Sequence, residues 1–399
     1  MSECNVSSSV QNDLLQISLA GRIDSANAAA VEASVLELRQ ANATASVCID
    51  AEKLEYISSA GLRILLKLQK GEKQKVQVLN VKPEVYEIFD VTGFVEILDV
   101  KKALRNVSID GCERLGVGGT GAVYRLSGDT IVKVYHPHIT LQQIEQERKF
   151  AKTAFVQGVP TAIAFDIVRC GDSYGTVYEL LDSDTFASAI VKHPEKFDEY
   201  MDKYVALVNT LHGIHVPAGS FDSIKDVLHP RIDLVAKYME PSEVELMHSM
   251  VDDMRDTDTL VHGDLHPGNI MLQGDELMII DMADMTTGAP IYDLTCLYRD
   301  LVSAAQSAPQ IIEQSVGMKT DMIAKVWQGF ITRYLGTTDA AEIDAYEKKL
   351  QLLYMFNLVP MMALAPAEML EHAIPKLTAV LRQIVIPNEK VLRQMLSTL

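Results

Sequence analysis

The sequence is poor in cysteine, tryptophan and basic side chains. Its five cysteines are odd in number and lie far apart, so they form neither a disulfide framework nor a metal-ligand spacing. Lysine and arginine total 36 against 54 aspartates and glutamates, which gives a formal net charge of −18. Residues 1–106 hold 12 basic and 14 acidic side chains, so nearly all of the negative excess falls on the rest of the chain. This charge argues against DNA and RNA as partners, because binding them depends on clustered lysine and arginine.

The sequence also has no long uninterrupted apolar run, and we expect no signal peptide. The chain starts Met1-Ser-Glu-Cys-Asn, without the basic and apolar regions of a signal peptide. The most hydrophobic stretch, residues 350–370, is interrupted by Asn357, Pro360 and Pro366, which is typical of buried helices rather than a membrane span. We therefore expect a cytoplasmic protein with no membrane partner. A length of 399 residues favours two or three domains.

The first hundred residues have the pattern of a small α/β domain. Apolar runs predict strands at residues 14–19, 47–50 and 76–81. Helical spacing follows the first strand, with Asp24 or Ser25 as its cap, and a second helix opens at Ser58-Ser59. Strands that alternate with helices predict a sheet with helical cover over residues 1–106.

Two motifs make this segment resemble the STAS domain, the fold of bacterial anti-sigma factor antagonists: Gly21-Arg-Ile-Asp-Ser25 and Tyr56-Ile-Ser-Ser-Ala-Gly-Leu-Arg63. The resemblance implies an anti-sigma-factor-like protein partner. In the antagonists the second motif reads Asp-Ser-Ser-Gly-Leu, and its first serine is phosphorylated; that serine corresponds to Ser59, while Ser58 replaces the aspartate. A phosphate there would meet the free N–H groups of a helix start and add roughly −1.5 to −2 charges to a docking surface. The alternative is that both serines are only helix caps.

A nucleotide-binding pattern begins after residue 106. The glycine-rich segment contributes Gly116, Gly118, Gly119, Thr120, Gly121 and Val123. Glycines at this spacing let a backbone close over phosphates without side-chain clashes. Lys133 then lies inside an apolar strand, where a lysine is costly unless it is paired or binds an anion. The next helix offers Glu147 as its partner, with Glu145 as the fallback, and this order of elements is typical of kinases.

Two further strands, residues 162–169 and 175–181, follow this helix. In kinases the second such strand leads into the hinge that pairs with adenine. By position, Tyr178 would be the gatekeeper, and the backbones of Glu179 and Leu181 would contact adenine. An ordinary hairpin is the alternative interpretation.

The segment from His262 to Asn269, followed by Asp281, carries the chemistry. His-Gly-Asp, four residues and Asn, then an acid after a strand, resembles the loop of the aminoglycoside phosphotransferase-like kinases, and the resemblance covers roughly residues 111–380. It implies that Asp264 orients or deprotonates an acceptor hydroxyl. It also implies that Asn269 and Asp281 bind Mg²⁺ on the phosphates of ATP.

Four neighbouring residues receive lesser roles. We expect His262 to brace the loop and His266 to be structural. Asp284 lines the metal site or is a surface acid, and Asp293 caps and anchors a helix below the site.

The predicted fold is therefore multidomain, combining α/β and α+β parts. A STAS-like domain covers residues 1–106, a kinase N-lobe residues 107–185, and a mostly helical C-lobe residues 186–399. Gly263 replaces the arginine that docks a phosphorylated activation loop in protein kinases, and only about a dozen residues separate Asp281 from the Asp293 helix.

These two features favour a small-molecule hydroxyl as the acceptor, and the acidic lobe permits one that bears an amine. A protein serine, Ser59 of this chain or its equivalent in a partner, is the alternative acceptor. A third interpretation of the whole chain is a nucleotide sensor that switches protein partners without turnover.

Overall fold

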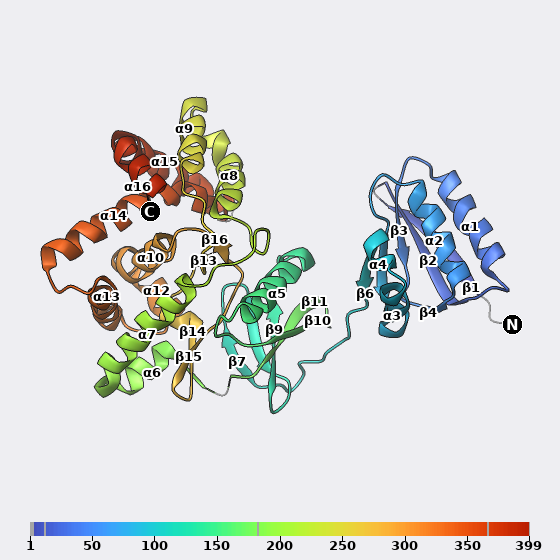
Figure 1. Cartoon of the computed structure of the whole chain (residues 1–399), viewed down its shortest axis with the longest axis horizontal. Coiled ribbons are helices and arrows are strands. Elements are labelled where there is room, and N and C mark those ends of the chain that lie inside the picture. Colours follow the sequence, from blue (N-terminus) through green and yellow to red (C-terminus); the bar gives the residue numbers. More distant parts are fainter. Residues whose placement is uncertain (1–3, 12, 182, 365–366, 399) are drawn as a thin grey trace. The chain divides into compact units, whose positions relative to one another are not determined.

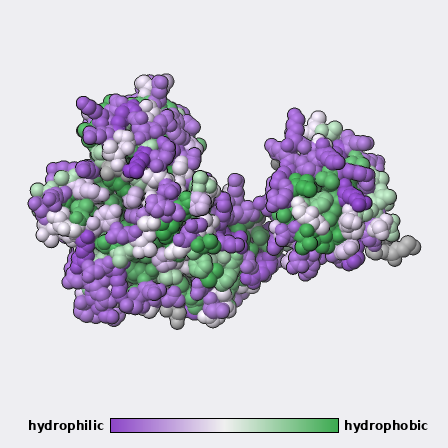
Figure 2. Space-filling model, in the orientation of Figure 1, coloured by the Kyte–Doolittle hydropathy of each residue, from purple (hydrophilic) through white to green (hydrophobic). Residues whose placement is uncertain are grey.

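The computed structural model describes residues 4–11, 13–181, 183–364 and 367–398. The chain divides into two compact units, Met1–Val107 and Ser108–Leu399. Hydrophilic residues dominate the surface of each unit on the face shown in Figure 2, and smaller apolar areas are scattered among these hydrophilic residues. No helix in the described ranges is long and apolar enough to cross a membrane.

The first unit is a six-stranded sheet covered by helices, which confirms the predicted STAS-like α/β fold. Its strands are β1 (Cys4–Gln11), β2 (Leu14–Ile23), β3 (Ser46–Asp50), β4 (Leu54–Ile57), β5 (Gln77–Val81) and β6 (Asp99–Lys102). Its helices are α1 (Ala28–Ala41), α2 (Ser59–Lys70), α3 (Pro83–Val91) and α4 (Phe94–Ile97). The strand order is β1-β2-β3-β5-β6, with β4 also paired to β2, and only β1 runs antiparallel to its neighbour. Figure 1 shows α1 and α2 side by side across this sheet.

Alternation along β2 explains why this sheet is covered on one face. Leu15, Ile17 and Leu19 are buried, whereas the residues between them are partly exposed. Side chains alternate between the two faces of a strand, so the buried set packs under the helices. The same apolar face continues into β3 and β5 and forms the core of the unit.

The predicted start of the first helix was wrong. The helix α1 begins at Ala28 with Asn27 in the cap position, one turn beyond Asp24 and Ser25. The Asp24 carboxylate instead accepts a hydrogen bond from the backbone N–H of Ala26 (2.9 Å). This local side-chain to backbone bond stabilises a turn in place of a first helical turn.

The N-lobe of the second unit is a five-stranded antiparallel sheet with one long helix. The strands are β7 (Arg114–Val117), β8 (Gly121–Arg125), β9 (Thr130–Tyr135), β10 (Ala164–Cys170) and β11 (Ser173–Glu179), in the order β10-β11-β9-β8-β7. The helix α5 (Leu141–Val156) starts with a capping box formed by Thr140 and Gln143, which fixes where it begins. Its buried face includes Glu147, which therefore points at the sheet.

The C-lobe is mostly helical, as predicted. Its helices are α6 (Phe186–Lys192), α7 (Phe197–His212), α8 (Ile224–Val235), α9 (Pro241–Asp252), α10 (Ile291–Tyr298), α11 (Ala305–Ser307), α12 (Pro309–Val316), α13 (Thr320–Leu335), α14 (Ala340–Met361), α15 (Ala367–Val380) and α16 (Glu389–Thr398). Short strands are β12 (Asp184–Thr185), β13 (Leu260–Val261), β14 (Ile270–Gln273), β15 (Glu276–Ile279) and β16 (Thr286–Thr287). A π-helical turn, Arg299–Ala304, extends α10. The apolar stretch after residue 350 forms most of α14, whose buried face packs into the core, and Pro366 lies outside the described residues.

Candidate active site

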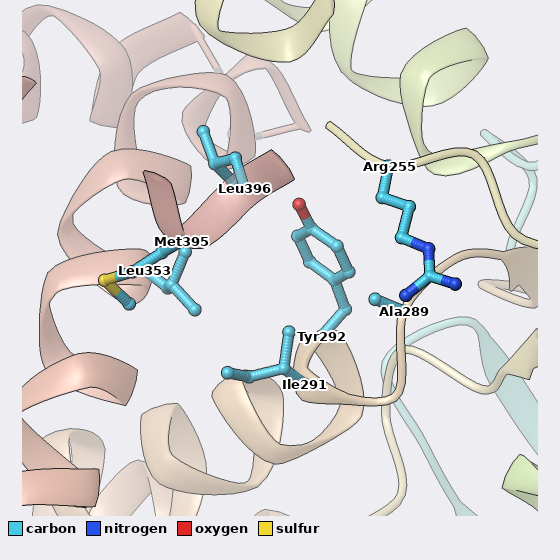
Figure 3. A pocket seen from close by; sticks show the side chains of 7 residues that line it. All are labelled: Arg255, Ala289, Ile291, Tyr292, Leu353, Met395 and Leu396. Carbon is cyan, nitrogen blue, oxygen red and sulfur yellow. The ribbon is translucent and has the colours of Figure 1, made fainter. Parts of the chain in front are cut away.

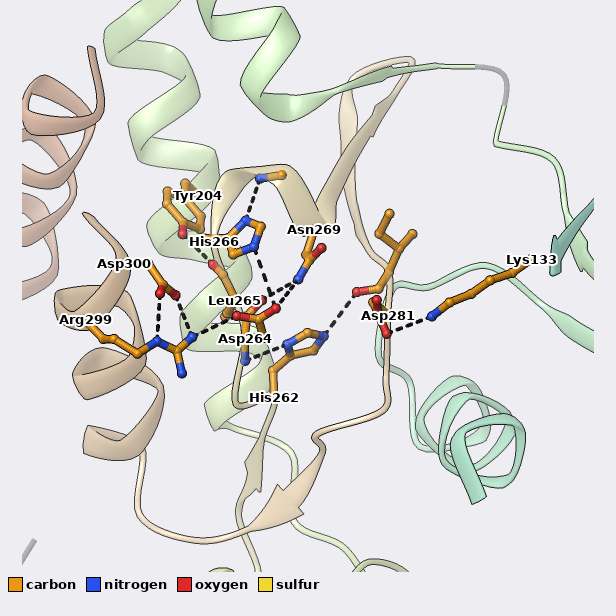
Figure 4. A network of polar contacts seen from close by, with 12 residues as sticks. Lys133, Tyr204, His262, Asp264, Leu265, His266, Asn269, Asp281, Arg299 and Asp300 are labelled. Atoms are coloured by element: carbon orange, nitrogen blue, oxygen red, sulfur yellow. Dashed lines mark hydrogen bonds and ion pairs between the residues drawn. The ribbon is translucent and has the colours of Figure 1, made fainter. Parts of the chain in front are cut away.

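Lys133 connects the two lobes of the second unit. It lies on β9 with only 12% of its side chain exposed, and its Nζ donates hydrogen bonds to Glu147 Oε1 (2.8 Å) and to Asp281 Oδ1 (3.1 Å). Burial alone would lower the pKa of Lys133, but the charges of Asp281 and Glu147 outweigh it and raise that pKa. The lysine is therefore a fixed cation between a helix of the N-lobe and the acid that follows β15, as Figure 4 shows on the Asp281 side.

Glu147, the partner expected from the sequence, is 6% exposed and also accepts a hydrogen bond from the Tyr178 hydroxyl (3.2 Å). Burial raises the pKa of Glu147, and the Lys133 charge opposes this rise. Tyr178 lies on β11 at the position expected for a gatekeeper. The Tyr178 hydroxyl and the Lys133 ammonium thus donate to the same carboxylate oxygen, Oε1 of Glu147.

The loop after β13 is organised by the buried side chain of His262. Its Nδ1 accepts a hydrogen bond from the backbone N–H of Asp264 (3.2 Å), and its Nε2 contacts the carbonyl oxygen of Ile280 (3.2 Å). A carbonyl only accepts, so these partners assign the proton to Nε2. One imidazole thereby ties the loop of Asp264 to the residue just before Asp281 (Figure 4).

Asp264 is held on both carboxylate oxygens. Oδ1 accepts a hydrogen bond from Arg299 Nη2 (2.9 Å), and Oδ2 accepts one from Asn269 Nδ2 (2.8 Å). The Nε2 of His266 lies 3.7 Å from Oδ2, and the Nδ1 of the same ring accepts from the Gly268 N–H, so this histidine also caps the turn that carries Asn269. With 34% of its side chain exposed, Asp264 stays open to an incoming group while its orientation is fixed.

Asp281 and Asn269 fit a divalent metal that is shared with phosphates. Asn269 uses its amide nitrogen on Asp264, which turns its amide oxygen away from that residue. Asp281 has a φ of +65°, a backbone conformation that non-glycine residues adopt rarely and mostly at functional sites. Mg²⁺ is usually bound by one or two carboxylates together with substrate phosphates. Among the described residues, no group of three or more His, Cys, Asp or Glu side chains is placed to hold a metal ion.

The fully buried Asp293, in the first turn of α10, anchors the loop from below. Its Oδ1 accepts the Gly263 N–H (2.7 Å), and its Oδ2 accepts the His262 N–H (3.0 Å) and contacts His212 Nε2 (3.0 Å). Burial would raise the pKa of Asp293, but the hydrogen bond and charge of His212 outweigh it and lower that pKa. The expected anchoring role therefore acts on the loop itself rather than on the helix alone.

The glycine-rich segment runs from β7 into β8. Gly116 lies on β7, Gly118, Gly119 and Thr120 form the turn, and Gly121 begins β8. Its turn is closed by a hydrogen bond from the Gly118 N–H to the Gly121 carbonyl (2.8 Å), and Val123 follows on β8. A Cβ at Gly121 would lie 2.2 Å from a backbone oxygen of β9, so packing within the protein requires this glycine. A Cβ at Gly116 or Gly119 would meet nothing within 4 Å. The bare backbone at these two positions leaves room for a ligand.

The predicted hinge follows β11. The Glu179 N–H donates to the Ile163 carbonyl (3.0 Å), and the Glu179 carboxylate accepts the Ile163 N–H (3.3 Å). Leu181 is buried, and its carbonyl accepts the Ser183 N–H (2.9 Å). The backbone N–H of Glu179 is thus already hydrogen-bonded within the protein.

Arg299 and Asp300 also belong to the site and were not expected from the sequence. Arg299 donates from Nε and Nη2 to the two oxygens of Asp300 (both 2.7 Å) while it holds Asp264, and all three side chains lie together in Figure 4. Both residues lie in the π-helical turn after α10, a feature often found at functional sites. An Arg-Asp pair on a helix has no motif of its own, so no signal in the sequence marked it.

A small cavity elsewhere in the C-lobe is not a competing site. It is lined by Arg255, Ala289, Ile291, Tyr292, Leu353, Met395 and Leu396, from α10, α14, α16 and neighbouring loops (Figure 3). Its volume of about 10 Å³ is no larger than one water molecule needs. The residues with the chemistry therefore meet at the lobe junction and not in this cavity.

In the first unit, the two motif serines have different positions. Ser58 is the cap of α2, and its hydroxyl accepts a hydrogen bond from the Gly61 N–H (3.4 Å). Ser59 is exposed in the first turn of the same helix. A Cβ at Gly61 would collide with Ile57 and Ile23 at 2.6–2.7 Å, which explains the glycine of this motif.

Comparison with known proteins gives each unit a family. Residues 111–317 match the profile described as "Phosphotransferase enzyme family", and residues 7–99 match that described as "Mlab, STAS domain". The proposed anti-sigma factor antagonist BtrV of Bordetella bronchiseptica is 38% identical over 85 residues, which are 21% of this chain and 72% of that protein. The anti-sigma-B factor antagonist of Bacillus subtilis is 26% identical over 93 residues, 23% of this chain and 83% of its own length.

Among solved structures, ADP-bound aminoglycoside phosphotransferase APH(2″)-Ib is 16% identical, with a TM-score of 0.46, and the match covers 69% of this chain and 94% of that one. A gentamicin complex of APH(2″)-IIa is also 16% identical, with a TM-score of 0.45, and covers 76% and 97%. The two family profiles fall on the two compact units in turn. The chain belongs to the phosphotransferase enzyme family and carries an N-terminal STAS domain of the anti-sigma factor antagonist type.

Proposed function

We propose that the chain is a kinase that transfers the γ-phosphoryl group of ATP, bound with Mg²⁺, to a hydroxyl of a small molecule. One observation carries the proposal: Lys133 bonds Glu147 and Asp281 at once, while Asp264 is held open and oriented by side chains on both oxygens. Transfer to a hydroxyl needs a phosphate-binding cation and an acid beside the acceptor, facing one junction.

Each residue then has a role. The loop with Gly116, Gly118, Gly119, Thr120, Gly121 and Val123 covers the phosphates, Lys133 binds the α- and β-phosphates, and the carbonyl of Glu179 and N–H of Leu181 contact adenine. Asn269 and Asp281 hold Mg²⁺, which would neutralise charge that develops on the phosphates. Asp264 accepts the hydroxyl proton as the acceptor oxygen bonds to the γ-phosphorus and the bond to the ADP oxygen breaks.

A small acceptor is supported by the short segment between Asp281 and Asp293. Between Asp281 and the start of α10 at Ile291, the one regular element is β16, which pairs with β13 rather than forming a platform for a peptide. The STAS domain would regulate the kinase or bind an anti-sigma-factor-like protein.

The test is ATP turnover by the full chain with a panel of hydroxyl compounds. We expect Asp264→Ala to abolish transfer and to leave ATP binding, followed as a thermal shift, largely intact. Unchanged transfer by this variant would refute the assigned role of Asp264. ATP binding by the natural chain without transfer to any acceptor would instead favour a nucleotide sensor.

A second acceptor, Ser59, is favoured by its exposure in the first turn of α2 while Ser58 serves as the cap. Incubation with labelled ATP alone tests it. Label that disappears in Ser59→Ala but persists in the control Ser9→Ala, an exposed serine on β1, would support a serine kinase acting on its own or a partner STAS domain. Equal labelling of the two variants would remove Ser59 as the acceptor.

A further inference from the structure

Arg231, on α8, contacts the segment that packs on the loop of Asp264. Its Nη2 lies 3.9 Å from Asp284 Oδ1. Asp284 in turn packs on the loop, because a Cβ at Gly263 would lie 2.9 Å from the Asp284 carbonyl oxygen and 3.1 Å from its Cβ. Gly263 directly precedes Asp264, so Asp284 and the guanidinium beside it lie next to the loop that carries this acid.

This guanidinium is poorly satisfied for a group that is only 23% exposed. Its contact with Asp284 is too long for a hydrogen bond, and among the described residues it makes no other ion pair and no hydrogen bond. Burial lowers the pKa of Arg231, and Asp284 offsets this only in part. A desolvated cation with unused donors is costly in a folded protein unless a ligand uses them.

A second partly buried arginine near the loop, Arg299, has its donors occupied. Arg299 donates three hydrogen bonds, two to Asp300 and one to Asp264, so its charge is already matched. Arg333, on the far side of the C-lobe helices, is 27% exposed and bonds Asp198, Asp202 and a backbone carbonyl. Arg299 and Arg333 are thus about as exposed as Arg231 but are hydrogen-bonded within the protein, whereas Arg231 is not.

We propose that Arg231 binds an anionic group of the acceptor, so that the acceptor is a hydroxyl compound carrying a carboxylate or a phosphate. The planar guanidinium offers paired N–H donors that match either group. Asp284 keeps the arginine near the loop without occupying its donors. The inference rests on the proposed phosphotransfer and adds the class of acceptor to it. The carboxylates of Asp264 and Asp284 leave room for an amine on the same molecule, so charge on the acceptor must be tested group by group.

A panel of small alcohols separates these groups. Glycerol bears neither charge, glycerate a carboxylate, glycerol 3-phosphate a phosphate, ethanolamine an amine, and serine an amine with a carboxylate. We expect the full chain to prefer anionic members of the panel to their uncharged or amine-only counterparts in kcat/KM. Arg231→Gln should reduce that preference by roughly 10- to 100-fold, the size of a hydrogen-bonded charge contact. Arg333→Gln, the matched control, should leave it unchanged.

Binding is measured in parallel, by calorimetry with ADP and Mg²⁺ saturating, so that the anions cannot enter the nucleotide site. Binding of glycerate, serine or glycerol 3-phosphate that Arg231→Gln loses and Arg333→Gln keeps supports the proposal, even if no member of the panel is phosphorylated. Preference for glycerol or ethanolamine, or equal binding by both variants, overturns it and shows that Arg231 only tethers the segment around Asp284. If the chain binds anions in a way that depends on Arg231 but does not turn over ATP, the phosphotransferase function is rejected and the anion site is not.

Discussion

Replacing Arg299 tests how the acid of the catalytic loop is held. Arg299→Gln removes the partner of Asp300, which is only 11% exposed, and one of the two bonds that orient Asp264. Leaving a buried charge without its partner typically costs about 3–5 kcal/mol. We therefore expect the free energy of unfolding of the second unit to fall by about 3 kcal/mol, the low end, because the pair is not fully buried.

The assay uses the single tryptophan of the full chain. Trp327 is buried in α13, where its ring lies edge-on to Tyr298 and its Nε1 donates to Glu347 (2.7 Å). Its fluorescence in a urea titration follows the second unit alone. The double variant Arg299→Gln/Asp300→Asn lacks the buried Asp300 carboxylate that Arg299→Gln leaves without a partner, so it should recover most of the lost stability. It should not recover the lost turnover, because Asp264 still lacks its arginine.

The pH dependence of this variant has a defined sign. Burial raises the pKa of Asp300, and Arg299 opposes the rise. Without the arginine, the folded-state pKa lies further above the unfolded value, so the folded protein binds more protons and its stability falls as pH rises. The deficit of Arg299→Gln should thus be larger at pH 8 than at pH 5. This account of the loop would be refuted if Arg299→Gln were as stable as the natural chain at pH 8, or if the double variant kept full turnover.

Three further predictions concern the same unit. Asp293→Asn should cost about 2–4 kcal/mol at pH 7, because the amide keeps only one acceptor oxygen for the two loop N–H groups that the carboxylate binds. Since the folded pKa of Asp293 is depressed, the difference from the natural chain should shrink as pH falls below about 4, measured by urea titration. Gly121→Ala should lower the melting temperature, since its Cβ would press on a backbone oxygen of β9. Gly119→Ala should leave the melting temperature unchanged and slow ATP turnover. If Gly119→Ala instead lowers the melting temperature and leaves turnover unchanged, the loop does not approach phosphates. Lys133→Met should remove most of the ATP-induced thermal shift, and a full shift would exclude Lys133 as a phosphate ligand.

The sequence could predict what local pattern and spacing determine. Lys133 stood out as a charge inside an apolar strand, and Glu147 lay one helix later on a face that the structure buries. The alternation of strands and helices likewise indicated both fold classes. These features depend on neighbours in the chain, so periodicity and motif order were sufficient.

Other features depend on contacts between distant segments. Strand β1 is polar, Cys-Asn-Val-Ser-Ser-Ser-Val-Gln, and forms because all eight residues pair with β2, which no local pattern reveals. Arg299 reaches Asp264 across 35 residues, and His212 reaches Asp293 across 81. Such partners become visible only once helices are packed, because an arginine or histidine on a helix is usually a surface residue.

The side chain of His262 has one more consequence. It accepts from the Asp264 backbone on one nitrogen and donates to the Ile280 carbonyl on the other. The loop that carries Asp264 and the segment that leads into Asp281 are therefore joined through this single ring, so the His262 side chain helps to fix the distance between the two acids.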